Sequence, residues 1–352
     1  MRNKAILLCL VLLLSSTTQF SNQLKESENI SNTAQQSCEA NRNETWTIGL
    51  IYCDGLIQAG YTLFSPMASE TSYLIDQYGR EVHSWTSPNG YTGLSSYLLD
   101  EGDLLRPINL GNNQPGEFSA GGSMGGFERI SWDGNQEWFW TYSSDQYRSH
   151  HDIEPLPNGN ILIIAWEYKN ASQAEDMGKV IGNTSSKTIG TASVWPDKVL
   201  EIKPVGIDDA EIVWEWSFWD HTIQDIDNTK ENFGNISEHP ELLDINFGYS
   251  GQDWLHCNGI DYNHMLDQIA LSCKNTNEIY IIDHSTTTEE ASGHTGGNSG
   301  MGGDILYRYG NPESYGRGNS SDQLLFSQHD ARWIEEGYPD AGKLMIFNNG
   351  NG

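Results

Sequence analysis

The sequence alternates two kinds of short β segment, and this repetition limits the folds available to the chain. Segments of the first kind have apolar residues at every second position around a Gly, Asp or Asn turn, and cover residues 72–85, 127–140, 199–216 and 278–307. Segments of the second kind follow them and start at residues 94, 151, 256 and 329. Each pattern predicts a β-hairpin. Two hairpins per unit give the four strands of a propeller blade, whereas a β-sandwich, the alternative, does not need a two-part repeat.

We therefore expect an all-β fold of the β-propeller type, with about four blades visible in this chain and its domain over residues 46–352. The 36 glycines and 12 tryptophans fit a turn-rich protein with large aromatic packing units. Segments 168–193 and 284–303 are rich in Gly, Ser and Thr and are expected to be loops on a propeller face. The sequence ends at Asn-Asn-Gly-Asn-Gly without a closing strand, so we expect C-terminal blades to be missing.

The N-terminus has the pattern of a secretory signal peptide. Arg2 and Lys4 precede an apolar run over residues 5–14, which Ser and Thr residues follow. This run is much shorter than the roughly 20 residues that span a bilayer. We expect a signal peptide over residues 1–20, a flexible leader over 21–45, and export to the periplasm or beyond without membrane insertion after cleavage. An uncleaved signal anchor is the alternative. The net charge of −29 makes nucleic acids and anionic membranes poor partners.

Three histidines occupy one position of the repeat. When the second hairpins are aligned, Leu94, His151, His256 and His329 become equivalent. Equivalent positions in successive blades lie at similar radius and height, so the three imidazoles are expected to converge on the central channel. A single histidine is more often a satisfied structural residue, but three at one repeat position favour a site. A zinc site is the competing functional interpretation.

The hairpin that follows His256 predicts further contacts. With a turn centred near Met265, His256 faces Lys274 and Cys257 faces Cys273. Because side chains alternate across a strand, His256, Asn258 and Lys274 are expected on one face and both cysteines on the other. In an exported protein the facing cysteines predict a cross-strand disulfide, with two buried free thiols as the alternative.

A group of histidines with a lysine and an amide suits the chemistry of anions. A neutral imidazole is a nucleophile, a protonated imidazole is an acid, and an ammonium stabilises developing negative charge. Zinc is less favoured, because the ammonium of Lys274 would be repelled by a dication. We therefore expect no metal and no cofactor at this site.

At these residues the chain resembles the bacterial aryl-sulfate sulfotransferase family, which uses no nucleotide sulfate donor. Four stretches carry the resemblance: His-His-Asp-Ile-Glu-Pro-Leu-Pro-Asn-Gly-Asn at 150–160, Asp-Trp-Leu-His-Cys-Asn-Gly-Ile at 253–260, Leu-Ser-Cys-Lys at 271–274, and Ser-Gln-His-Asp-Ala-Arg at 327–332 with Phe-Asn-Asn-Gly at 347–350. It implies a six-bladed propeller and transfer of a sulfuryl group from a phenolic sulfate ester to a phenol through a sulfated histidine.

Carried onto this chain, the resemblance implies that His329 is the nucleophile. It implies that His151 and His256 bind sulfuryl oxygens or handle the phenol proton. The chain departs from the family pattern at Lys274, where the family has arginine, and lysine lacks the bidentate fork that suits an oxyanion face. The alternative function is a non-catalytic, exported binding or adhesion propeller whose histidine centre has drifted.

Overall fold

The computed structural model describes residues 59–111, 113–180, 193–248 and 251–350. The predicted signal peptide, the predicted leader and three of the five cysteines lie outside these residues. In the described parts, every helix is too short or too polar to span a lipid bilayer. The chain divides into two compact units, a small one that ends with residues 72–85 and a large one that contains residues 65–71 and 86–352.

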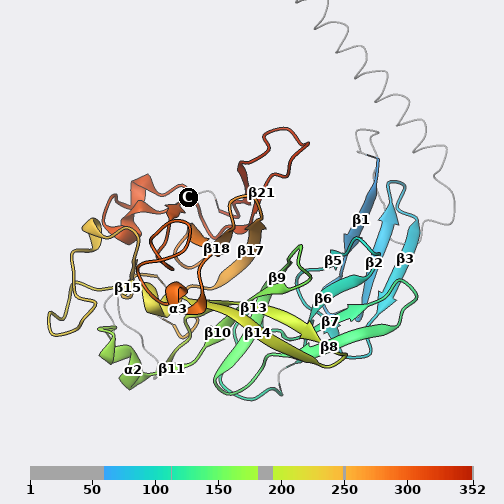
Figure 1. The fold of residues 1–352 in the computed structure, drawn as a ribbon, viewed down its shortest axis with the longest axis horizontal. Helices are drawn as coiled ribbons and strands as arrows, with labels where there is room; N and C mark the ends of the chain where they lie inside the picture. Colours follow the sequence, from blue (N-terminus) through green and yellow to red (C-terminus); the bar gives the residue numbers. More distant parts are fainter. Residues whose placement is uncertain (1–58, 112, 181–192, 249–250, 351–352) are drawn as a thin grey trace, which may run out of the picture. The chain divides into compact units, whose positions relative to one another are not determined.

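The small unit contains a three-stranded sheet in the order β1-β2-β3 (Figure 1). Its strands are β1 (Tyr61–Phe64), β2 (Thr71–Asp76) and β3 (Glu81–Thr86). The pair β2–β3 is the hairpin predicted over residues 72–85, and it turns at Gly79, whose φ of 73° lies in the left-handed region.

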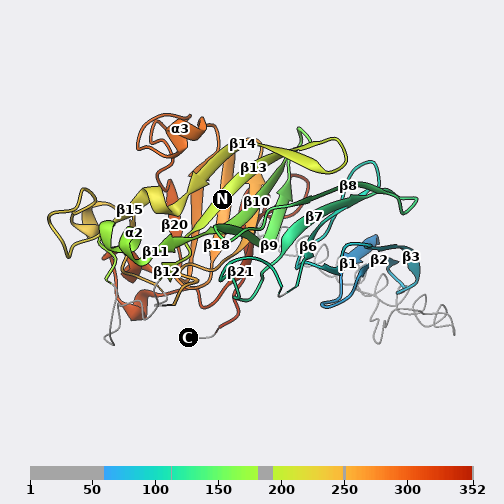
Figure 2. The same cartoon turned by 90° about the horizontal axis from the view of Figure 1, so that it is seen from below.

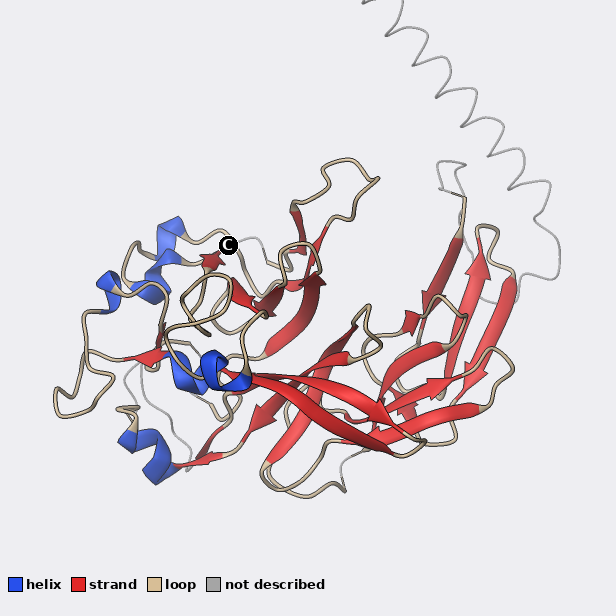
Figure 3. Ribbon diagram, in the orientation of Figure 1, coloured by secondary structure: helices blue, strands red, loops and turns tan. Residues whose placement is uncertain are grey.

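The large unit contains three antiparallel sheets, each made of two hairpins (Figure 3). Their orders are β5-β6-β7-β8, with the short β4 also on β6, then β9-β10-β13-β14 and β17-β18-β19-β20; the two-stranded sheet β21–β22 follows. The strands are β4 (Tyr91–Thr92), β5 (Tyr97–Leu98), β6 (Leu104–Asn109), β7 (Gly125–Ile130), β8 (Gln136–Thr141), β9 (Tyr147–Pro155), β10 (Ile161–Glu167), β13 (Asp197–Val205), β14 (Asp209–Ser217), β17 (Cys257–Asn263), β18 (Gln268–Cys273), β19 (Glu278–Asp283), β20 (Tyr307–Tyr309), β21 (His329–Trp333) and β22 (Leu344–Phe347). The predicted all-β propeller with about four blades is confirmed, since three blades are complete and a further one begins at β21.

Short elements fill the connections between the blade strands. They are β11 (Lys169–Asn170), α2 (Ala171–Asp176), β12 (Ser193–Val194), η1 (Phe218–His221), β15 (Thr222–Ile223), η2 (Ile236–Glu238), β16 (Leu243–Asp244), α3 (Thr288–Ala291), η3 (Pro312–Tyr315) and η4 (Ser320–Asp322). Of the segment expected as a loop over 168–193, the described part carries β11 and α2, and residues 181–192 lie outside the description.

The apolar core of the large unit lies between neighbouring blades. Leu105 and Phe127 of one blade pack with Ile163 and Leu200 of the next. The same arrangement continues between the second and third blades, through Val199 with Leu271 and other residues. The second blade thus buries one face against the first blade and the other against the third, which is how a propeller obtains a core from successive sheets.

The first strands of the blades approach one another at the centre. Strand β17 packs against β9 on one side and against β21 on the other. Arg332 of β21 reaches Tyr97 of β5, with 2.8 Å between Nη2 and the phenol oxygen, and Tyr97 donates to Asp152 of β9 at 3.0 Å. The three strands at which the aligned histidines lie are therefore the inner strands of their blades.

One histidine joins two blades through two carboxylates. Nε2 of His284 lies 2.9 Å from Glu201 of β13, and Nδ1 lies 2.8 Å from Asp267, beside β18. Burial alone lowers the pKa of His284, but the hydrogen bonds to Glu201 and Asp267 outweigh it and raise that pKa. Burial alone would raise the pKa of Glu201, but the hydrogen bonds of this carboxylate, that with His284 foremost, outweigh burial and lower its pKa.

We expect the bridge that His284 forms between Glu201 and Asp267 to stabilise the fold only within a limited range of pH. The part due to His284 is complete below its unfolded pKa of about 6.5 and is lost as pH rises through its raised folded pKa. The part due to Glu201 is present above about pH 4.3 and is lost as pH falls through its lowered folded pKa. In urea unfolding at a series of pH values, His284→Gln should lower the free energy of unfolding by about 1–3 kcal/mol between these limits. The difference in the free energy of unfolding between this variant and wild type should shrink toward pH 9. A difference that does not change with pH would show that His284 is not charged in this bridge.

Candidate functional site

The aligned histidines of the repeat meet at the inner ends of their blades. His151 lies in β9, His256 directly precedes β17, and His329 is the first residue of β21. The ring centroids of His151 and His256 are 4.5 Å apart, at 72° to each other. His151 and His329 line one cavity of about 560 Å³, together with Leu94 and Asn258. The structure thus brings the repeat positions together; His256 lies against His151, outside the lining of this cavity.

A glycine makes room for the His151 ring. A Cβ atom on Gly122 would lie 2.1 Å from Cε1 of His151, and Gly122 has φ of 81°, a conformation that favours glycine. The backbone N–H of His151 also donates to the carbonyl of Gly122 at 2.9 Å. The ring is therefore clamped by a loop that sequence alignment of the repeat does not reveal.

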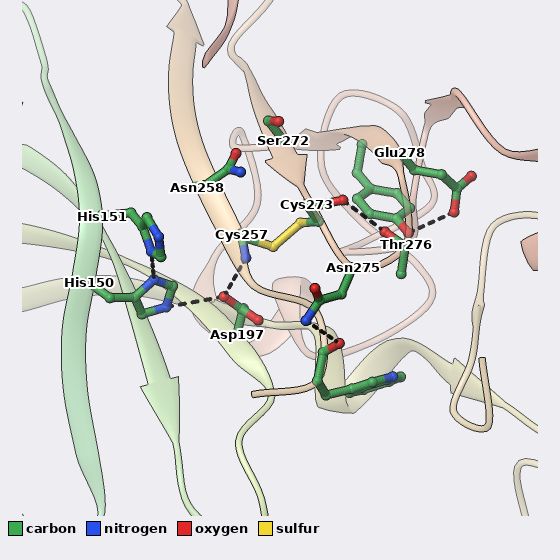
Figure 4. The surroundings of a disulfide bond; sticks show 12 residues. His150, His151, Asp197, Cys257, Asn258, Ser272, Cys273, Asn275, Thr276 and Glu278 are labelled. Atoms are coloured by element: carbon green, nitrogen blue, oxygen red, sulfur yellow. Dashed lines mark hydrogen bonds and ion pairs between the residues drawn. A yellow bond between two sulfur atoms is a disulfide. The ribbon is translucent and has the colours of Figure 1, made fainter. Parts of the chain in front are cut away.

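His151 belongs to a buried chain of polar groups (Figure 4). Its Nδ1 lies 3.0 Å from Nδ1 of His150, and Nε2 of His150 lies 3.1 Å from Oδ1 of Asp197. The same Asp197 oxygen accepts the backbone N–H of Cys257 at 3.1 Å. His150 is fully buried and stacks on Trp166, with ring centroids 4.0 Å apart. The repeat analysis missed His150, although the adjacent His-His pair could have pointed to it.

Burial sets the protonation of this chain. It lowers the pKa of His151 well below the usual range, and the neighbouring His150, His256, His329 and Lys274 lower it further. Burial also lowers the pKa of His150, to about 3. It raises the pKa of Asp197 well above the usual value, and the charge of a second carboxylate acts in the same direction. Two neutral imidazoles are therefore expected at pH 7, and burial favours the protonated form of the Asp197 carboxyl group.

His256 is held by a carboxylate three residues before it. Its Nδ1 is hydrogen-bonded to Oδ2 of Asp253, and Oδ1 of the same carboxylate accepts the Nε1–H of Trp166 at 2.9 Å. A hydrogen bond from Nδ1–H to a carboxylate fixes the tautomer and leaves Nε2 free to exchange a proton. The sequence analysis missed Asp253 as a partner, although it lies in one of the quoted motifs.

His329 is half-buried at the edge of the cavity. Its Nδ1 lies 3.0 Å from the carbonyl oxygen of Ser327 and 2.8 Å from Nδ2 of Asn349. A carbonyl can only accept, so we assign the proton to Nδ1, with the Asn349 amide turned so that its oxygen rather than its NH₂ group faces this nitrogen; a lone pair is then left on Nε2. Burial lowers the pKa of His329, and the charges of His256 and Lys274 act in the same direction. A neutral ring with a free Nε2 is the form that can act as a nucleophile.

Lys274 and Asn258 complete the predicted set. The Lys274 backbone N–H donates to the carbonyl of His256 at 3.1 Å, and its ammonium has no hydrogen bond or ion pair with any described residue. Nδ2 of Asn258 donates to the carbonyl of Gln328 at 2.9 Å, whereas its buried Oδ1 has no partner within the described chain. The amide oxygen of Asn258 can therefore meet a ligand in the cavity, whereas Lys274 lies outside the residues that line it.

The predicted disulfide between Cys257 and Cys273 is present (Figure 4). The two residues face each other in the pairing of β17 with β18, as the sequence predicted. Because this bond ties the start of β17 to the end of β18, it holds His256 and Lys274 next to each other. Two buried free thiols, the alternative, are excluded.

Charged groups that the repeat pattern does not single out lie in and beside the cavity. Arg332 lies 3.5 Å from both Asp152 and Glu154. Burial raises the pKa of Glu154 to about 9, so this carboxyl group is neutral at pH 7. Burial also raises the pKa of Asp152, and the charge of Arg332 opposes that shift. The ion pairs of Arg332 join β21 to β9, and Arg332 and Asp152 add charged groups to the lining of the cavity.

The tryptophans that could have stacked on a phenyl ring belong to the core. Trp166 and Trp254 are fully buried, and Tyr142 is nearly so. Of the aromatic residues, Tyr97 lines the cavity beside Leu94. An aromatic ligand in this cavity would therefore contact Tyr97 rather than a tryptophan.

Comparison with known proteins gives a family match over most of the chain. The family model described as Arylsulfotransferase (ASST) matches residues 34–352. Similar solved structures include hydrazine synthase from Kuenenia stuttgartiensis, at 11% identity and a TM-score of 0.42 over 82% of this chain and 68% of that one. They also include streptogramin B lyase, at 11% identity and a TM-score of 0.33 over 82% of this chain and 87% of that one. No curated protein matches this sequence.

Proposed function

The chain belongs to the arylsulfotransferase (ASST) family, and we propose that it moves a sulfuryl group from an aryl sulfate ester to a phenol by way of a sulfated His329. Membership of this family supports sulfotransferase activity in general. The observation that carries the finer proposal is the pair of imidazoles, His151 and His329, that line one cavity; burial lowers the pKa of both, and the charge of Lys274 lowers each further.

In the first half-reaction, Nε2 of His329 attacks the sulfur atom of the ester. A nitrogen–sulfur bond forms, the bond between sulfur and the aryl oxygen breaks, and its electron pair leaves on the phenolate oxygen. In the second half-reaction, the oxygen of the acceptor phenol attacks the same sulfur, and the nitrogen–sulfur bond breaks. Because both halves use one histidine, we expect ping-pong kinetics.

His151 is placed to donate a hydrogen bond to a sulfuryl oxygen. Nε2 of His150 makes no hydrogen bond with any described residue, so a neutral His150 is best satisfied with its proton on Nδ1, from which it donates to Nδ1 of His151. This direction of donation leaves the proton of His151 on Nε2. A donor that is fixed before the reaction stabilises charge on the sulfuryl oxygens without reorganisation.

His256 is suited to move the phenol proton. With its Nδ1–H bonded to Asp253, Nε2 can give a proton to the departing phenolate and take one from the incoming phenol. The two transfers cancel over a full turnover, so no external acid or base is required. Asp253 stabilises the imidazolium form, which precedes the first transfer and follows the second.

The proposal is tested with purified protein, an aryl sulfate donor and a phenol acceptor. We expect the release of a chromogenic phenol to depend on the acceptor, with formation of the acceptor's sulfate ester. No release and no product with several aryl sulfates, from a folded sample, would support the non-catalytic binding propeller instead.

Lys274 is expected to supply the positive charge for the sulfuryl oxygens. Lys274→Met should lower kcat/KM by about 10²–10³-fold, whereas Lys274→Arg should retain most of the activity because it keeps the charge. The charge of Lys274 lowers the pKa of His329, so Lys274→Met should also move the acidic limb of the pH profile to higher pH. The exposed Lys203→Met is the control. Equal activity of Lys274→Met and Lys203→Met would exclude this role.

We further propose that the protein is exported. The disulfide between Cys257 and Cys273 requires an oxidising compartment to persist. The N-terminal basic residues and apolar run supply the pattern of an export signal.

A further inference from the structure

Three side chains with metal-binding atoms meet outside the cavity described above. They are His221, His294 and Asp304, whose donor atoms all lie within 4.8 Å of one another. His221 is the last residue of η1 and is fully buried, and Asp304 has an exposed fraction of 6%. None of the three lines the cavity of His151 and His329.

The hydrogen bonds of His221 leave a lone pair facing a carboxylate. Nε2 of His221 lies 2.8 Å from the carbonyl oxygen of Ala291, which can only accept, so the proton is on Nε2. Nδ1 of a neutral ring then presents its lone pair to Oδ1 of Asp304, at 2.9 Å. Two acceptors at this distance, both buried, need a positive species between them, either a further proton or a metal ion.

The third side chain favours the metal ion. Nδ1 of His294 lies 2.7 Å from the same Asp304 oxygen. Two imidazole nitrogens and one carboxylate oxygen are donors that zinc and similar divalent transition metals prefer. The His294 side chain is 59% exposed, so water can reach a fourth position.

The cluster is close to the dimensions of a zinc site. Donor atoms around tetrahedral zinc lie about 3.3 Å apart, so binding requires the Asp304 oxygen to lie roughly half an ångström farther from each of the two imidazole nitrogens. His294 lies on an exposed loop and can make this movement. The loop is also fitted closely to His221: a Cβ on Gly303 would lie 2.6 Å from Nε2 of His221.

The location of the cluster indicates what a metal ion would do. Residues 284–306 connect β19 to β20 and contain only the four-residue helix α3 and turns (Figure 2). His294 and Asp304 belong to this loop, whereas His221 belongs to the segment after β14. We propose that His221, His294 and Asp304 bind one divalent transition metal ion of the zinc class, which ties this loop to η1.

The test uses the full-length protein after removal of metals with a chelator. Zinc should bind in a one-to-one ratio by calorimetry and raise the midpoint of thermal unfolding. His294→Ala, at an exposed position that the fold does not need, should weaken zinc binding by more than about 100-fold and abolish the shift in midpoint. His239→Ala removes an exposed histidine that pairs with Glu241 outside the cluster, and should behave as wild type.

Two results would overturn the proposal. If wild type binds no zinc, His221 and Asp304 share a proton and form a buried ion pair. If His294→Ala binds zinc as wild type does, the metal lies elsewhere. The readouts do not involve sulfuryl transfer, so the inference stands or fails independently of the proposed function.

Discussion

His329→Ala should abolish sulfuryl transfer, with a loss of at least about 10⁴-fold in kcat. The variant lacks the nitrogen that would carry the sulfuryl group, and the remaining histidines cannot take its place. His151 carries its proton on Nε2 in this mechanism and so has no free lone pair there, and His256 lies outside the lining of the cavity. Because the His329 ring is half-buried at the start of a strand, its removal should leave the fold intact.

Mass spectrometry of the protein after exposure to donor alone checks the same prediction. Wild type should gain the mass of one sulfuryl group on the peptide that contains His329, and should lose it when a phenol is added. His264→Ala, an exposed histidine in the turn between β17 and β18, is the control and should retain both behaviours. A stable sulfated peptide that contains His151 or His256 instead would move the nucleophile to that residue.

Local sequence patterns predicted the blades because each blade is made of adjacent hairpins. The pairing of Cys257 with Cys273 followed from counting outward from a turn centred near Met265. From Gly259 to Asn263 the strands pair one residue away from that count, and a bulge between Cys257 and Gly259 restores it at the cysteines. Side chains alternate along a strand whatever packs against it, so this alternation can be predicted without knowing the neighbouring blades. The convergence of His151 and His256 followed from the repeat, since equivalent positions in a propeller surround one axis.

Contacts that join distant segments were not predictable in this way. His151 and His256 have φ of 55° and 53°, so the backbone departs from regular strand geometry where their side chains are oriented. The link from His150 to Asp197 connects positions 47 residues apart, on strands β9 and β13 that do not pair with each other. The cluster at His221 depends on how the loop before β20 folds back, which no periodicity encodes.

Asp253→Asn should impair the proton transfers while leaving the nucleophile intact. The amide oxygen can still accept from Trp166, and its NH₂ group then faces Nδ1 of His256. An NH₂ group can only donate, so the ring must place its lone pair on Nδ1 and its proton on Nε2. His256 can then no longer accept a proton from the phenol, and we expect a loss of about 10²–10⁴-fold in turnover with a phenol acceptor.

The choice of donor separates this positioning role from a general loss of structure. An acidic nitrophenol leaves as its anion and needs no proton, so single-turnover release from a nitrophenyl sulfate should fall by less than about tenfold. Release from phenyl sulfate needs the proton and should fall as far as turnover does. Asp330→Asn removes a charge beside His329 without touching His256, and should not show this dependence on the leaving group. If Asp253→Asn slows both donors equally, Asp253 supports the fold of the site rather than the tautomer of His256.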